Sequence, residues 1–121
     1  KCTVTPIAIN WLSEDGMVHS ISLPNELSLD AIEEHFQSIE ELTGGTPRPF
    51  IIDPKLSSMQ ITAASRKLLA SKIERNISCA AFVIDQKFLT LAINIFFRMR
   101  KSEVPVKCFS DTTLAKEWLN K

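Results

Sequence analysis

Glycine is scarce in this chain of 121 residues, and the motifs that depend on it are missing. Only three glycines occur, too few for the glycine-rich loops that cradle phosphate groups. The patterns G-x-S-x-G, G-x-G-x-x-G, the P-loop and H-E-x-x-H are all absent from the sequence. The sequence thus lacks these hydrolase, nucleotide-binding and zinc-protease signatures, and we expect a protein that is not an enzyme.

Cysteine and histidine are also too few and too scattered for a metal site. Cys2, Cys79 and Cys108 are an odd number of cysteines without C-x-x-C spacing, which favours free thiols in a reduced, cytoplasmic setting. Neither His19 nor His35 has a second histidine three or four residues away that would form a metal-binding pair. We therefore expect no metal and no cofactor.

Long hydrophobic runs and an excess of one charge are missing as well. The longest apolar run, around residues 91–97, is far shorter than the roughly 20 residues that span a bilayer, and no leader-like segment opens the sequence. The formal net charge is zero, and no aromatic residues for base stacking are interleaved on the faces expected to carry Arg66, Lys67, Arg98, Arg100 and Lys101. Neither a membrane span nor a nucleic-acid partner is expected, and the length fits one domain over residues 1–121.

The zero net charge conceals an asymmetry along the chain. Residues 1–45 contain one basic residue and eight acidic ones, a formal charge of −7, so residues 46–121 carry +7. This pattern is typical of the solvated side of one acidic helix. It is also compatible with a face that docks a basic partner, or with self-association of the protein.

Two strands of a hairpin are expected at the start of the chain. Apolar alternation predicts strands over residues 4–12 and 17–23, and Asp15-Gly16 between them is a hairpin turn signal. Pro6 lacks an N–H group, which places the first strand at an edge of the sheet.

An acidic helix should follow the hairpin. Apolar residues at helical spacing predict it over residues 29–42. Ser28 is the expected N-cap and Gly44-Gly45 the expected stop, because serine caps helix N-termini well and glycine adopts the conformation that ends a helix.

Three strand-then-helix units complete the chain. Continuously apolar strands, buried on both faces, are predicted over residues 49–53, 79–85 and 104–109. A helix capped by Ser57 should follow the first strand, with Ile61, Ala64, Leu68 and Ile73 facing inward, and one over about residues 87–101 should follow the second. The closing helix is expected to be capped by Ser110 or Asp111 and to dock through Leu114, Ala115, Trp118 and Leu119.

The element order is therefore β-β-α-β-α-β-α-β-α, an α/β fold. Strands separated by helices of this length pair in parallel through right-handed crossovers. We expect a mostly parallel five-stranded sheet with one antiparallel edge strand and helices packed on it.

Polar residues at the carboxyl ends of the strands are the best candidates for a binding site. Asp53, Asp85 and Ser110 lie where open α/β sheets bind their ligands. Carboxylates at such an edge could hold Mg²⁺ or act as acid and base. Aspartate before a helix is, however, more often a turn former and helix cap.

A second candidate surface lies on the helix expected over residues 87–101. Its apolar arc is wider than packing against one sheet requires, and Ile93 and Phe97 lie one turn apart at its flank. These two residues could line a subunit interface or an apolar ligand pocket, or be buried beneath a neighbouring helix.

The segments IIDPKLSSMQITAASRKLLASKI, AAFVID and PVKCFSDTTLAKEWL resemble the small bacterial STAS-like family, whose fold is that of the anti-sigma-factor antagonists. The closing pattern of Phe109, Ser110, Ala115, Trp118 and Leu119 resembles in particular a group of uncharacterised STAS-like proteins. The resemblance covers nearly the whole chain. It implies a STAS-like fold and a role in protein interaction or regulation.

The best-understood family members carry D-S-S-G, with its first serine phosphorylated, at the start of the helix after this strand. Here Leu56-Ser57-Ser58-Met59 stands near that place, without the aspartate and the glycine. Ser57 or Ser58 could still accept phosphate at a helix N-terminus. Asp53 and Lys107 also resemble the acceptor and lysine of receiver domains, but those domains do not begin with a hairpin.

We therefore expect a non-enzymatic, cytoplasmic STAS-like interaction domain that binds a protein partner or itself as a homodimer. A small carrier of an apolar or lipid-like ligand is the alternative, and a phosphoacceptor or enzyme that uses Asp53 and Asp85 is the third hypothesis.

Overall fold

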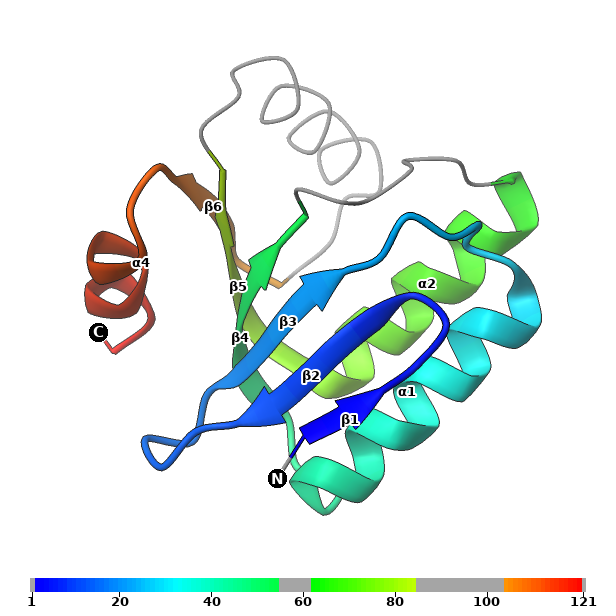
Figure 1. The fold of residues 1–121 in the computed structure, drawn as a ribbon, viewed down its shortest axis with the longest axis horizontal. Helices are drawn as coiled ribbons and strands as arrows, with labels where there is room; N and C mark the ends of the chain where they lie inside the picture. The colour runs from blue at the N-terminus through cyan, green and yellow to red at the C-terminus, as the bar shows by residue number, and fades with distance from the viewer. Residues whose placement is uncertain (1, 55–61, 85–103, 121) are drawn as a thin grey trace.

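The computed structural model describes residues 2–54, 62–84 and 104–120, which form one six-stranded sheet with helices on both faces (Figure 1). The strands are β1 (Cys2–Val4), β2 (Ala8–Leu12), β3 (Val18–Ser22), β4 (Arg48–Asp53), β5 (Ile77–Val83) and β6 (Val106–Phe109). The helices are α1 (Leu29–Thr43), α2 (Ala63–Asn76) and α4 (Thr112–Leu119). The predicted α/β class is confirmed.

The strands follow one another across the sheet in sequence order. The β1–β2 and β2–β3 pairs are antiparallel, and the β3–β4, β4–β5 and β5–β6 pairs are parallel. The sheet therefore has a parallel part with an antiparallel edge, as predicted, but with six strands in place of five.

The sixth strand arises because the chain turns after Val4, so the strand predicted over residues 4–12 begins only at Ala8 and the separate strand β1 pairs with it as a hairpin. Pro6 lies in its turn, where its missing N–H group costs no ladder bond. The turn is closed by the amide N–H of Thr5, which donates to the carbonyl of Ala8 at 2.9 Å. The edge position predicted from Pro6 is correct, and the edge strand itself is the three-residue β1.

Helices α1 and α2 cover one face of the sheet and α4 covers part of the other (Figure 1). The larger core, between the sheet and α1 and α2, contains Val18, Ile32, Ile39, Phe50 and Phe82. The smaller core, under α4, contains Met17, Ile51, Ala81, Ala115 and Leu119. Phe50 and Ile51 are consecutive and both buried, which confirms that β4 is covered on both faces.

Local capping explains where α1 begins and ends. The hydroxyl of Ser28 accepts from the N–H of Ala31 at 3.2 Å, as expected for an N-cap. Gly44 and Gly45 have φ values of 73° and 84°, and the N–H of Gly45 donates to the carbonyl of Glu40. Both predicted ends of this helix are confirmed.

The start of α2 differs from the prediction. The helix begins at Ala63, and the hydroxyl of its N-cap Thr62 accepts from the N–H of Ser65 at 3.1 Å. Ser57 is therefore not the N-cap of α2, and it lies outside the described residues. Ala64, expected to face inward, is exposed, whereas Ser65 and Ile73 are buried.

The closing helix α4 docks more narrowly than predicted. Ala115 and Leu119 are buried, but Leu114 is 51% exposed. Asp111, one of the two residues expected as cap, holds this role: its carboxylate accepts from the N–H groups of Thr113 at 2.6 Å and Leu114 at 3.3 Å. The helix expected over about residues 87–101 lies outside the described residues.

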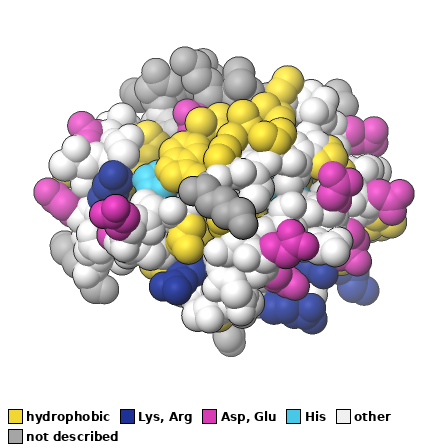
Figure 2. Space-filling view, turned by 60° about the horizontal axis from the view of Figure 1, so that its bottom comes forward, with side chains coloured by type: hydrophobic (Ala, Val, Ile, Leu, Met, Phe, Trp, Pro, Cys, Tyr) yellow, Lys and Arg dark blue, Asp and Glu magenta, His cyan; other side chains and the backbone are white. Residues whose placement is uncertain are grey.

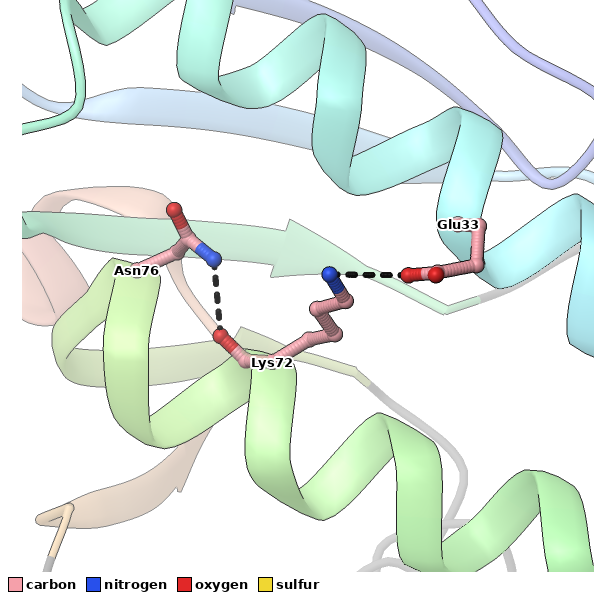
Figure 3. A network of polar contacts seen from close by, with 3 residues as sticks. All are labelled: Glu33, Lys72 and Asn76. Carbon is pink, nitrogen blue, oxygen red and sulfur yellow. Dashed lines mark hydrogen bonds and ion pairs between the residues drawn. The ribbon is translucent and has the colours of Figure 1, made fainter.

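The two halves of the charge asymmetry lie side by side in space. The acidic α1 packs next to α2, whose outer face carries Arg66, Lys67 and Arg75. The ammonium group of Lys72 lies 2.8 Å from the carboxylate of Glu33 and joins the two helices (Figure 3). The side-chain amide of Asn76 donates to the carbonyl of Lys72 at 2.9 Å and helps to end α2.

Candidate functional site

The carboxyl ends of β4, β5 and β6 lie on one edge of the sheet, because these strands are parallel neighbours. Asp53 is the last residue of β4 and is half-buried, and Ser110 follows β6 and is exposed. Between them, the N–H of Ile84 donates to the carbonyl of Phe109 at 2.7 Å. The structure thus places Asp53 and Ser110 on the same edge, as expected, with β5 between their strands.

The other predicted site residues cannot be placed on this edge or elsewhere. Ser57, Ser58 and Asp85, and the apolar pair Ile93 and Phe97, lie outside the described residues. The neighbour of Ser110 has an established local role, since the carboxylate of Asp111 caps α4. The roles of the five unplaced residues remain predictions.

The two histidines differ in burial and in the groups that they contact. His35 on α1 is buried, and its Nδ1 lies 3.0 Å from the hydroxyl of Thr5, while burial lowers its pKa to about 4. His19 on β3 is half-buried, and burial, followed by the charge of Lys116, lowers its pKa. Within residues 2–54, 62–84 and 104–120 no group of three or more His, Cys, Asp and Glu side chains could hold a metal ion.

One face of β1, β2 and β3 carries apolar side chains that no described helix covers. Side chains alternate between the faces of a strand, and residues paired across strands share a face. The register pairs Val4 with Ile9, Ile9 with Ile21, and Trp11 with His19. We call these five residues the open sheet face.

The pairing of β3 with β4 identifies which side of the sheet carries the open sheet face. His19 pairs with Ile51, whose side chain lies in the smaller core under α4. The open sheet face is therefore the continuation of the surface on which α4 packs. The intervening residues Ala8, Asn10 and Val18 point the other way and are buried.

The side chains of the open sheet face are partly accessible to solvent. Val4 is 69% exposed, and the other four residues are half-buried. The rings of Trp11 and His19 stack with their centroids 5.0 Å apart and an angle of 8° between their planes. Figure 2 shows a face of the molecule on which hydrophobic side chains gather beside a histidine.

Charged groups stand at the border between the open sheet face and α4. Asp53 pairs with Ile21 across β3 and β4, so it shares this face and lies where the face meets the carboxyl edge of the sheet. Burial lowers the pKa of His19, and the charge of Lys116 on α4 lowers it further, which places Lys116 near this border. One sequence-predicted site residue, Asp53, is thus adjacent to the apolar surface that sequence reasoning missed.

A sequence signal for the open sheet face does exist. Ile9 and Trp11 alternate with Ala8 and Asn10, so the chain marks two different faces of β2. The pattern does not say which face is covered, because that depends on where the helices pack.

A solved structure has the same fold. It is the crystal structure of an uncharacterised protein of the DUF3478 family from Shewanella loihica PV-4, described as having a SpoIIAA-like fold. The two chains are 16% identical, the match covers 98% of each, and the TM-score is 0.67. The STAS-like fold expected from the sequence resemblance is thereby confirmed.

Comparison with curated proteins gives no match. In the described part of the chain, no helix has both the length and the apolar character needed to cross a membrane. The profile of a family described as a domain of unknown function, DUF7793, matches residues 10–121. Because this match includes most of the sequence, the chain belongs to the DUF7793 family.

Proposed function

We propose that this protein is a non-enzymatic protein-interaction domain and that the open sheet face is its binding surface. The observation that supports the proposal is the apolar character of Val4, Ile9, Trp11 and Ile21 on a face without a described cover. In antiparallel sheets with one solvated face, the outer positions are normally polar. An apolar patch at these positions is typical of a surface that meets a partner.

Burial of this surface by a partner would be favourable. Each Å² of apolar surface removed from water contributes about 25 cal/mol. Trp11 is the natural centre of such an interface, because tryptophan is enriched among residues that dominate binding energy. Its stacking on His19 holds the ring in place before a partner arrives, so less side-chain entropy is lost on binding.

The carboxyl edge of the sheet extends the proposed surface. Asp53 borders the open sheet face through its pairing with Ile21. A carboxylate at the margin of an apolar patch supplies specificity for a partner with a basic or hydrogen-bonding group at the matching position.

Site-specific photo-crosslinking in the organism of origin tests the proposal. A photoreactive amino acid at Ile9 should give adducts of higher mass that are protein in nature, because Ile9 lies within the open sheet face. The matched control is the same amino acid at Gln37, an exposed position on α1, where we expect few adducts or none.

Equal adduct formation at Ile9 and Gln37, or none at either position, would contradict the proposed function. Native mass spectrometry of the purified protein supplies a second check. Retention of a small apolar molecule that is lost on substitution of Trp11 would favour the alternative role as a carrier.

A further inference from the structure

We propose that the partner presents an amphipathic α-helix, which lies on the open sheet face next to α4 and runs along the strands. This inference rests on the proposed function and names the class of partner. It follows from how α4 packs, from the width and area of the open surface, and from the charges at its border.

The packing of α4 shows what kind of element this face accepts. The helix lies over β4, β5 and β6, with Ala115 and Leu119 buried against Ile51 and Ala81. The same face continues without a break into β3, β2 and β1, because His19 pairs directly with Ile51. On the opposite face two helices, α1 and α2, lie side by side over the sheet (Figure 1).

The width of the open surface matches one helix. Neighbouring strands are about 4.8 Å apart, so β1 to β3 span roughly 10 Å. A helix with its side chains has a diameter of about 10–12 Å. A second helix parallel to α4 would therefore cover Ile9, Trp11 and Ile21 at once.

The apolar area argues against a second copy of the chain as the occupant. Only Val4 is largely exposed, while Ile9, Trp11 and Ile21 are half-buried, so the exposed apolar area is on the order of a few hundred Å². A stable protein–protein interface buries about 800 Å² on each partner. One apolar helix stripe, with anchors at i, i+3, i+4 and i+7, fits the smaller area.

The border with α4 predicts the charge on one flank of the docked helix. Burial and the nearby Lys116 lower the pKa of His19, which disfavours a positive charge on the ring beneath the docked helix. Lys116 is near His19, on the flank of α4 that faces the open surface. Leu114 and Trp118, one turn apart on α4, lie on the other flank, where Trp118 contacts Phe109 of β6. An acidic residue on the docked helix would face Lys116.

Selection from a displayed library of helical peptides tests the inference. In this library, apolar residues are fixed at positions i, i+3, i+4 and i+7, and the residues on either side of this stripe are varied. A matched control library has the same composition, but its apolar and polar residues alternate as in a strand. We expect enrichment from the helical library alone, a gain of helicity on binding measured by circular dichroism, and resonance shifts at Ile9, Trp11 and Ile21.

Substitutions test whether the selected peptides bind to the open sheet face, and an exposed position is included so that a loss of binding is not confused with misfolding. Val4→Asp and Trp11→Asp should each weaken the selected peptides at least tenfold, whereas Leu114→Asp, at an exposed apolar residue on the far flank of α4, should leave the affinity within twofold. Val4 is 69% exposed, so Val4→Asp is informative even where Trp11→Asp reduces stability. Lys116→Glu should shift the selected flank residues from acidic to basic.

The outcomes distinguish the proposed interaction domain from the proposed helical partner. Enrichment from the control library would indicate strand addition at β1 and overturn the helix proposal, as would no enrichment. Concentration-dependent dimerisation that is lost in Val4→Asp would show a second copy as the occupant. If crosslinks at Ile9 form while no helical peptide is enriched, the result supports an interaction domain and contradicts only the proposal that its partner is a helix.

Discussion

The hydroxyl oxygen of Thr5 lies 3.0 Å from Nδ1 of His35 and joins the β1–β2 turn to helix α1. The same hydroxyl donates to the carbonyl of Ala8 and accepts from its N–H, both at 3.1 Å. Because the hydroxyl proton is directed to Ala8, the imidazole donates its Nδ1–H to Thr5. A buried, neutral histidine thus fixes the edge of the sheet that carries Val4 and Ile9.

The burial of His35 makes stability depend on pH. The pKa of His35 falls from 6.5 to about 4 because burial disfavours the charged ring. Well above pH 6.5 the ring is neutral in both states, so the pH has no effect through this group. As the pH falls through 6.5 the unfolded chain binds a proton that the folded protein resists, and stability falls until the pH is below about 4, where both states are protonated.

We expect the free energy of unfolding to be about 2 kcal/mol lower at pH 5 than at pH 7.5 through this group alone. Urea unfolding at the two pH values measures the difference. His35→Asn keeps a donor near the position of Nδ1 and has no titrating ring, so it should remove most of the dependence. His19→Asn is the control, and an equal effect there would show that burial of His35 is not the cause.

Two substitutions of buried polar residues by valine should have opposite effects. The hydroxyl of Thr5 is fully hydrogen-bonded, so Thr5→Val should lower the free energy of unfolding by about 1–2 kcal/mol. The side chain of Asn10 is completely buried, and both polar atoms of its amide are without a hydrogen-bond partner. Asn10→Val should raise the free energy of unfolding by about 1 kcal/mol.

Both variants are compared with the parent protein by urea denaturation. Valine also suits a strand, so Asn10→Val in β2 is not confounded by a poor β-propensity. A loss of stability in Asn10→Val would mean that the amide is hydrogen-bonded to bound water in solution.

The end of α1 depends on the backbone of glycine. Gly44 has a φ of 73°, and a Cβ there would meet no atom within 4 Å, so the cost of a side chain is conformational and not steric crowding. Gly44→Ala should lower the free energy of unfolding by about 1 kcal/mol. Gly44→Asn should cost less, because asparagine tolerates this conformation; thermal unfolding that ranks the two variants the other way would refute the explanation.

Local signals account for the parts of the fold that the sequence predicts well. Ser28 and Gly44 act within one turn of α1, and Asp111 within one turn of α4, so their roles can be read from neighbouring residues. The common edge of Asp53 and Ser110 also follows from the sequence, since it requires only that β4 and β6 run in the same direction. The hairpin at Pro6 was missed because the apolar alternation continues through the turn.

The open sheet face could not be predicted for a different reason. Alternation at Ile9 and Trp11 shows that β2 has two unlike faces, and apolar residues usually point to the core. Here the crossovers place α1 and α2 on the side of Ala8 and Asn10, and α4 packs mainly over β4, β5 and β6 on the other. Which face is covered depends on contacts between distant segments, which no local pattern encodes.

The solvent exposure of this face can be tested by one substitution at two positions. Val4 and Val18 both lie in the antiparallel part of the sheet, but Val4 is 69% exposed and Val18 is fully buried. Val18→Thr should lower the free energy of unfolding by about 2 kcal/mol, because it buries a hydroxyl in the larger core. Val4→Thr should change it by less than about 0.5 kcal/mol.

Urea denaturation of both variants at two protein concentrations completes this test. A similar loss at both positions would mean that Val4 is covered in solution. A loss at Val4 that grows with protein concentration would show that the cover is another copy of the chain, since only association makes stability depend on concentration. A small, concentration-independent effect at Val4 would leave the open sheet face free to accept a partner.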